Sequence, residues 1–394
     1  MEPSALQKSM NMAMSRFREE SEEEDMPRKK KKVDWFLLLT DDIVVEILKK
    51  LPSSVLRYRG KYVCKRWFNL ITNQILLDHS SFIIQRSSGL HRARHIVVRE
   101  VKQKLEFEET YLEIPCRGRI KSWCNEFLLM VDPKRNETLY VYDLLTKKGF
   151  NLPQCSRSCG GHYTSKCCIS LCYDGILRLY KVIHMFMGSR IRCQILVLLS
   201  DVVSIISNFP KWKRIKVPSN MGEGQYYWGD PVSVQGRYLH WDVHSSDYLV
   251  SMDSVQERFY ETRLPGSNDE RMRNQYSFVE MNGFLALLDK VSGNKANLWI
   301  LKDFHKMKWE KLHSLNLSCH WYLSIYPQTD IPFPISSVVN KRHIIFKKPT
   351  RPRTVNGLLR YDLETNVVEG VPCTMSTGYN DRYVVQSVAP DLLW

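Results

Sequence analysis

The chain has 394 residues, enough for one large domain or two, and its 43% hydrophobic and 11% aromatic content is typical of a globular core. Its formal net charge of +15 is compatible with acidic partners or nucleic acid, although the basic residues are spread along the chain. The 11 cysteines lack the spacing of a disulfide framework, which favours a reducing compartment. The chain starts without an apolar signal-peptide core, and its longest apolar run, 195–209, is too short to span a bilayer, so we expect no membrane association.

Residues 1–34 are polar and show no apolar periodicity, which predicts a disordered tail. An acidic run at 19–25 is followed closely by five contiguous basic residues, Arg28, Lys29, Lys30, Lys31 and Lys32. Such a run after a proline resembles a nuclear-import signal, and a plain solvated tail is the alternative. We expect the protein in the nucleus and the cytoplasm.

Residues 35–80 predict three short helices. The first carries Ile43 and Ile47 at helical spacing and is stopped by Pro52, a shorter helix follows, and the third spans about 62–72. Three short helices cannot bury all of their own apolar surface. Part of their apolar face must therefore contact something else.

This segment resembles an F-box. The resemblance rests on a leucine before an acidic helix start, an E-I-L triplet, a Leu-Pro break, a V-C-K-x-W motif and an L-I pair: Leu39, Asp42, Glu46-Ile47-Leu48, Leu51-Pro52, Val63-Cys64-Lys65, Trp67 and Leu70-Ile71. In that family the exposed apolar face binds the Skp-type linker of a cullin ubiquitin ligase. The resemblance thus implies these linker-binding residues: Leu39, Ile43, Ile47, Leu51, Pro52, Val63, Cys64, Trp67 and Ile71.

Two departures from the F-box pattern bear on linker binding. Thr40 stands where the family usually has a proline, and the stretch from Pro52 to Val63 is longer by about one residue. Either departure weakens the case for linker binding. The alternative is an ordinary helical subdomain that packs on the rest of the chain.

Residues 81–394 predict an all-β fold, because short apolar runs alternate with turn residues and long helical periodicity is nearly absent. A strand, a tight polar turn and a second strand recur at 123–129, 171–177, 233–239, 279–285 and 338–344. A second hairpin follows each unit, often ending in an aliphatic residue and a proline. The repeat of about 50 residues matches a four-stranded propeller blade, so we predict six or seven blades. We expect the last strand, near 384–388, to close the ring against the segment near 96–98.

This region also resembles the F-box-associated, kelch-like domains of a large plant family. The residues that carry the resemblance are Cys124-Asn125 before Leu128-Leu129, Tyr140-Val141-Tyr142, Asn282-Gly283-Phe284-Leu285-Ala286-Leu287, and Leu298-Trp299-Ile300-Leu301-Lys302-Asp303 before Trp309. The resemblance implies an α+β multidomain protein, with a three-helix F-box at 35–80 and a kelch-like β-propeller at 81–394. The double-glycine signature of kelch repeats is missing, which leaves the blade count open.

Cysteines between positions 155 and 172 raise a zinc interpretation, together with His162: Cys155, Cys159, Cys167, Cys168 and Cys172. They lack paired C-x2-C knuckles, and the last three fall in a predicted strand. We therefore favour small buried thiols, and we expect no metal, no cofactor and no catalytic residue. Trp212 and Trp309 occupy equivalent repeat positions, which favours the blade core over a ligand surface. Aromatic clusters at 226–228 and 320–322 are candidates for target recognition.

These patterns predict a non-catalytic substrate adaptor of a cullin-type (SCF) ubiquitin ligase. The F-box would bind the Skp-type linker, and through it a cullin, while the propeller would bind a target protein. The alternative is a nuclear nucleic-acid-binding β-propeller protein outside any ligase, which rests on the net charge and the lysine run. No aromatic residue interleaves those lysines, so nucleic acid is the less favoured partner. A propeller enzyme is a third, weaker hypothesis, because no catalytic constellation is recognisable.

Overall fold

The computed structural model covers the chain from residue 39 to residue 387 with gaps. The residues it leaves undescribed within that range are 52–55, 57–59, 61–62, 72–78, 86–91, 102–103, 115–117, 133–137, 156–158, 160, 163–166, 175–176, 178, 188–190, 199–210, 218–229, 243–247, 266–275, 282, 293–294, 317–332, 339–341, 348–357 and 372–381. The predicted tail with its import signal lies outside the described residues. Neither of the helices described is long and apolar enough to cross a membrane.

Two helices are described in the predicted F-box segment. Helix α3 (Asp41–Leu48) confirms the first predicted helix. The negative charges of its two leading aspartates interact favourably with the positive end of the helix dipole. Helix α5 (Lys65–Leu70) starts later than expected, because Cys64 has an extended backbone and its sulfur accepts the N–H of Trp67 at 3.4 Å. Most of the second predicted helix lies outside the described residues, so the three-helix arrangement remains a prediction.

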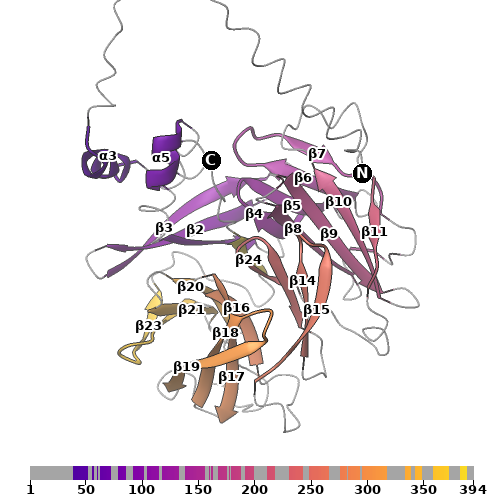
Figure 1. Ribbon diagram of the computed structural model, residues 1–394. Helices are drawn as coiled ribbons and strands as arrows, with labels where there is room; N and C mark the ends of the chain where they lie inside the picture. The colour runs from indigo at the N-terminus through magenta and orange to yellow at the C-terminus, as the bar shows by residue number, and fades with distance from the viewer. Residues whose placement is uncertain are drawn as a thin grey trace, which may run out of the picture. The chain divides into compact units, whose positions relative to one another are not determined.

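The β region forms a six-bladed propeller in which each blade is a four-stranded antiparallel sheet (Figure 1). Blade 1 contains β24 (Arg382–Ser387), β1 (His79–Gln85), β2 (Arg92–Val101) and β3 (Lys104–Glu113); blade 2 contains β4 (Arg119–Cys124), β5 (Phe127–Asp132), β6 (Thr138–Asp143) and β7 (Gly149–Asn151). Blade 3 contains β8 (Cys167–Asp174), β9 (Leu179–Met187), β10 (Ile191–Leu198) and β11 (Lys213–Ile215); blade 4 contains β12 (Val232–Val234), β13 (Tyr238–Asp242), β14 (Tyr248–Asp253) and β15 (Arg258–Arg263). Blade 5 contains β16 (Tyr276–Met281), β17 (Phe284–Ser292), β18 (Lys295–Asp303) and β19 (Lys308–Asn316); blade 6 contains β20 (Phe333–Val338), β21 (His343–Lys347), β22 (Leu358–Asp362) and β23 (Val368–Val371).

The five strand–turn–strand units join the first and second strands of blades 2 to 6, as predicted. Asn125, Gln235 and Gly283 hold the positive φ angles that such tight turns need, at 49°, 53° and 78°. The unit of blade 3 differs from the prediction. Its strands end at Asp174 and begin again at Leu179, and the Asp174 carboxylate accepts the N–H of Leu177 at 3.0 Å.

The hairpin between the third and fourth strands repeats one turn in four blades. An aspartate ends the third strand, and its carboxylate accepts an N–H two or three residues ahead: Leu145 to Asp143 at 2.7 Å, Val255 to Asp253 at 2.9 Å, Lys306 to Asp303 at 3.0 Å and Glu364 to Asp362 at 2.9 Å. The residue four positions after each aspartate has a positive φ of 53–60°: Lys147, Glu257, Met307 and Asn366. This turn was not recognised in the sequence, because its left-handed position carries no glycine.

Asp253 carries the best-supported of these turns. Arg237 donates to both of its carboxylate oxygens, at 3.1 and 2.6 Å, and the aspartate side chain is fully buried. Burial alone would raise the pKa of Asp253, but the hydrogen bonds from Arg237, Gln256 and Val255 hold it below its ordinary value.

The blades bury both faces, as β5 shows. Its residues Phe127, Leu129 and Val131 pack with side chains of blade 3, whereas Leu128 and Met130 pack with side chains of blade 1. Side chains alternate between the faces of a strand, so a blade between two neighbours needs apolar residues at every position. This explains the unbroken apolar run FLLMV in β5.

Each pair of neighbouring blades shares one apolar cluster. One cluster contains residues of blades 1 and 2, and the next contains residues of blades 2 and 3. The series continues in the same way up to the cluster of blades 5 and 6. The sixth cluster joins blade 6 to blade 1 through Ile345, Leu358, Phe82 and Ile84. The core is therefore a ring of six interfaces.

The last strand closes this ring, but not against the predicted partner. β24 pairs with β1, for example Val384 with Ile83, and also meets β4 in parallel at Gln386 and Trp123. The predicted partner, the segment 96–98, lies in β2, whose two edges are already occupied by β1 and β3. The carboxyl-terminal strand therefore pairs with the inner edge of β1, which β2 leaves free.

Trp212 and Trp309 lie where blade packing was predicted. Each is half-buried against an apolar cluster between its blade and the preceding one. Each indole N–H donates to a carbonyl of the preceding blade, Trp212 to Pro153 at 3.0 Å and Trp309 to Arg263 at 2.7 Å. The two tryptophans therefore help to join successive blades.

Ring closure can be tested at Val384, which is buried between blades 1 and 2. Val384→Asp should lower the free energy of unfolding by about 3–5 kcal/mol, because it leaves an uncompensated charge in an apolar cluster. Urea unfolding followed by tryptophan fluorescence measures the change. Val367→Asp is the matched control at an exposed valine of blade 6, and equal losses in the two variants would contradict the closure.

The aspartate turn can be tested by comparing two of its copies. Asp253→Ala should cost about 2–3 kcal/mol of unfolding free energy, because a buried carboxylate loses its turn hydrogen bonds and its Arg237 fork. Asp303→Ala removes the same turn bond at an exposed position and should cost clearly less. The ranking is read from urea midpoints, and a reversed order would show that the Arg237 fork is unimportant.

Candidate functional site

Helix α3 has one apolar stripe that is buried and another that is exposed. Val44 and Leu48 are fully buried, and they lie four residues apart on one face. Ile43 and Ile47, also four residues apart, are 48% and 42% exposed. The helix therefore uses one face for its own packing and presents a second apolar face to solvent.

The segment before α5 also exposes apolar side chains. Val63 is 62% exposed, Cys64 is also exposed, and Trp67 is half-buried on the first turn of α5. Leu39 and Leu51 are half-buried as well, and Pro52 lies outside the described residues.

Ile71 differs from the other residues assigned to the linker-binding face. It is fully buried, together with Phe68 and Leu70 of α5. Its side chain therefore belongs to the packing of the helices, and we leave it out of the contact surface. The F-box pattern alone does not distinguish the inward isoleucine from the outward ones.

The exposed apolar residues are concentrated in this short segment. The described part of the chain exposes eight large apolar side chains, and three of them are Ile43, Ile47 and Val63. The remaining five are scattered over the much longer β region. Exposed apolar residues that gather on one element are typical of an interaction site.

The exposed side chains of Ile43, Ile47 and Val63, with the partly exposed Trp67, offer apolar contact area rather than chemistry. The ion pair described on α3, Glu46 with Lys49 at 3.0 Å, is exposed and contributes little. The sulfur of Cys64 serves as a helix cap. The arrangement suits the binding of another protein.

A second site lies in blade 3, where the thiol interpretation holds only in part. Cys168 and Cys172 are buried among the apolar side chains of blades 3 and 4, as predicted. Cys155, Cys159 and Cys167 instead meet histidine side chains, and together with the partner histidines they could hold a metal ion.

The sequence did not identify one of those histidines, His184, as a candidate metal ligand. It sits in β9 within the run YKVIHMFM, far from the cysteines along the chain, so spacing could not connect it to them. The sequence feature that could have indicated His184 is a lone histidine within an apolar strand. The predicted recognition clusters at 226–228 and 320–322 lie outside the described residues.

Comparison with known proteins gives consistent matches. The F-box associated beta propeller domain family matches residues 82–387. The F-box protein At3g07870 of Arabidopsis thaliana is 23% identical over 311 residues, covering 70% of this chain and 72% of that protein. The F-box protein At1g52495 of the same plant is 22% identical over 293 residues, covering 69% and 67%. Among solved structures, TolB from Acinetobacter baumannii reaches a TM-score of 0.44 at 13% identity over 85% of this chain and 73% of that chain, a likeness too low to support an argument.

The two faces of α3 should respond differently to truncation. Leu48→Ala should destabilise the helix by about 2–5 kcal/mol, because it leaves a cavity at a fully buried position. Ile47→Ala, its exposed neighbour, should change stability by less than about 0.5 kcal/mol. Amide hydrogen exchange over residues 41–48 measures both, and equal protection in the two variants would contradict the assignment of the faces.

Proposed function

The chain belongs to the F-box associated beta propeller domain family, and from this premise we propose that it is the substrate adaptor of a cullin-type ubiquitin ligase. In this proposal the helical segment binds the Skp-type linker and the propeller binds a target protein. The observation that carries the proposal is the exposed apolar pair Ile43 and Ile47, in the segment that matches the F-box pattern.

The exposed stripe is large enough to contribute usefully to binding. Burying a whole aliphatic side chain contributes about 1.5–3 kcal/mol, so the exposed halves of Ile43 and Ile47 would contribute roughly 1 kcal/mol each. Val63 is more exposed still, and Trp67 supplies the kind of aromatic anchor that dominates many interfaces. These four residues form the core of the proposed linker contact.

The proposed mechanism is proximity. An adaptor that binds the linker with one part and a target with another holds the target near a ubiquitin-charged enzyme. This raises the effective concentration of the two reactants and requires no catalytic group in the adaptor. Six four-stranded blades provide a frame on which variable loops can bind the target.

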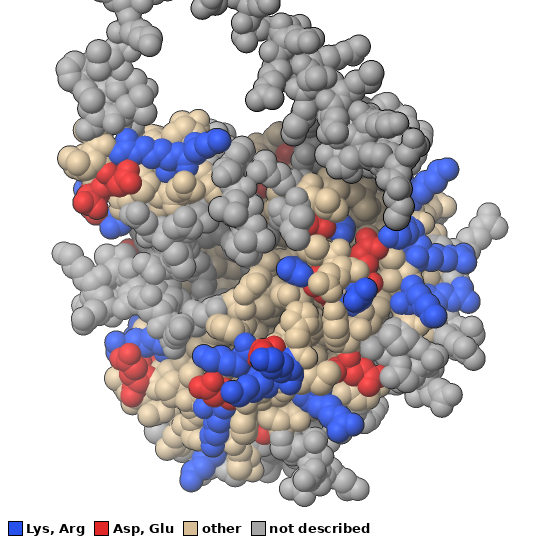
Figure 2. Space-filling model, viewed as in Figure 1, with Lys and Arg blue, Asp and Glu red and all other residues tan. Residues whose placement is uncertain are grey.

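The charge of the described surface favours this proposal over nucleic-acid binding. Figure 2 shows basic and acidic side chains interspersed on the face in view rather than gathered into one basic area. Several described basic residues are paired with acids, among them Arg237 with Asp253 and Lys213 with Glu257. A steep loss of RNA or DNA binding between low and moderate salt would instead support the nucleic-acid alternative.

Linker binding can be measured by titrating a purified Skp-type linker into the full chain in a calorimeter. Trp67→Ala should weaken binding by about 2 kcal/mol or more, roughly thirtyfold, because an interface anchor is lost. The double variant Ile43→Asp with Ile47→Asp should weaken it further, since two charges would have to be buried in an apolar contact.

Val291→Asp is the matched control for these variants, because Val291 is an exposed apolar residue of blade 5. It should leave linker affinity unchanged. Unaltered affinity in folded Trp67→Ala and isoleucine variants, or no binding by the wild-type chain, would refute the adaptor proposal.

A further inference from the structure

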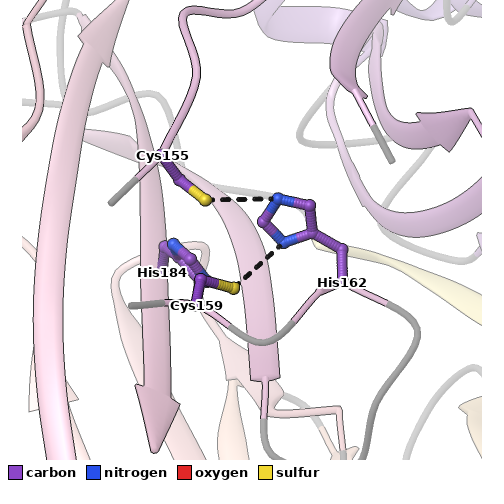
Figure 3. Close-up of side chains that lie close together, drawn as sticks. All are labelled: Cys155, Cys159, His162 and His184. Atoms are coloured by element: carbon purple, nitrogen blue, oxygen red, sulfur yellow. Dashed lines mark hydrogen bonds between the residues drawn. The ribbon is translucent and has the colours of Figure 1, made fainter. Parts of the chain in front are cut away.

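Five side chains with metal-binding atoms converge beside blade 3. Three of them come from the loop that connects blade 2 to blade 3: Cys155, Cys159 and His162. The other two, Cys167 and His184, come from the strands β8 and β9. Figure 3 shows the sulfurs of Cys155 and Cys159 directed at the ring of His162, with His184 beside Cys159.

The strand register explains why β8 and β9 both face this loop. His184 pairs with Ile169 of β8, and Ile169 lies two residues after Cys167, so Cys167 and His184 are diagonal neighbours on one face. That face packs toward blade 2, since Ile169 and Val182 both belong to the cluster between blades 2 and 3. Cys159 and His162 of the connecting loop contact His184 and Cys167 on this face.

The distances between ligand atoms, from 3.1 to 3.9 Å, scatter around those of a tetrahedral site. His162 Nδ1 lies 3.3 Å from the sulfur of Cys167 and 3.9 Å from that of Cys159. His184 Nε2 lies 3.1 Å from Cys167 and 3.4 Å from Cys159, and His162 Nε2 lies 3.5 Å from Cys155. With Zn–N of about 2.0–2.1 Å and Zn–S of about 2.3 Å, adjacent ligands of tetrahedral zinc lie about 3.3–3.8 Å apart.

We propose that this protein binds one structural zinc ion here, held by Cys159, His162 and His184 and by a fourth ligand, the thiolate of Cys167 or Cys155. The ligand atoms of Cys155, Cys159, His162 and His184 all lie within 4.8 Å of one another. Cys167 is closer to both histidines than Cys155 is to His162. Cys159 and Cys167 face Nδ1 of His162, whereas Cys155 faces Nε2, so Cys155 would be the fourth ligand only if the His162 ring presented Nε2 to the ion.

The donor atoms select zinc among the common metal ions. Thiolate and imidazole together suit zinc, whereas magnesium and calcium require oxygen ligands, and the cluster contains no carboxylate. Two thiolates and two neutral imidazoles would also balance the charge of a divalent cation. His162, Cys167 and His184 are buried, which is typical of a closed structural site rather than of a catalytic one with an open position.

The surroundings support His184 as a ligand. The amide nitrogen Nε2 of Gln194, on the neighbouring strand β10, lies 2.8 Å from its Nδ1. Turning this amide over by 180° would place its oxygen there to accept Nδ1–H, and the Nε2 lone pair of His184 would then face the sulfurs, as in zinc-bound histidines with an outer hydrogen-bond partner. The rings of Phe186 and Trp212, with centroids 4.7 and 5.8 Å from that of His184, shield the site from water.

The zinc ion would fasten the connection between two blades. The loop leaves β7, the outer strand of blade 2, and enters β8, the inner strand of blade 3, so zinc would fix it against β9 near its middle. The propeller would gain a cross-link where the chain passes from one blade to the next. This inference is independent of linker binding, and a zinc-loaded chain that fails to bind the linker would leave it intact.

Zinc content tests the proposal on the full chain. After purification under reducing conditions and gel filtration, elemental mass spectrometry should find about one zinc per chain. Cys159→Ala and His184→Ala should reduce it to less than about a tenth. Cys172→Ala and His240→Ala are matched controls, a buried thiol on the same strand as Cys167 and a buried imidazole in blade 4, and they should keep the zinc.

A measurement on the wild-type chain keeps the test decisive if the variants fail to fold. Cobalt(II) added to reduced, chelator-treated protein should give the visible bands of tetrahedral cobalt and a thiolate-to-cobalt band, both removed by zinc. Zinc should also raise the Tm in a concentration-dependent way.

Three results would overturn the inference. They are a purified chain without zinc that gives no tetrahedral cobalt spectrum, zinc retained equally by Cys159→Ala and His184→Ala, and a disulfide joining two of the three cysteines in protein kept reduced. Separate Cys155→Ala and Cys167→Ala variants identify the fourth ligand, because the variant that loses more zinc affinity lacks it.

Discussion

The burial of both faces of every blade is the constraint on which the rest of the propeller depends. A strand such as β5 directs apolar side chains to both sides, so its blade is stable only between two others. Six clusters then require a closed ring, and closure requires the end of the chain to return to its beginning. The pairing of β24 with β1 meets that requirement and ties the carboxyl-terminal strand into blade 1.

The helical segment follows a different rule, because it is too short to bury its own apolar residues. Val44 and Leu48 turn inward, while Ile43 and Ile47 remain at the surface. Among the described residues, the propeller buries nearly all of its large apolar side chains, whereas the helical segment leaves Ile43 and Ile47 exposed. The proposed adaptor function requires such a division, with one part for the linker and another for the target.

The cluster around His162 shows how a site can arise from residues without a motif. The connection between blades 2 and 3 contributes three ligand atoms, and neighbouring strands contribute two more. Every propeller must pass its chain from an outer strand to the next inner strand, and such crossings lack ladder hydrogen bonds. A metal at this crossing would supply the local stability that strand pairing cannot.

The sequence alone determined the repeat, because hairpin turns and strand alternation are local properties of neighbouring residues. It located all five strand–turn–strand units, the interblade tryptophans and the first helix, and the F-box resemblance identified the segment that exposes Ile43 and Ile47. The tertiary structure alone decided the closing partner of β24, the burial of Ile71 and the meeting of Cys159 with His184. These three features depend on which strand edges and blade faces remain free after the blades pack. The spacing of residues along the chain does not contain that information.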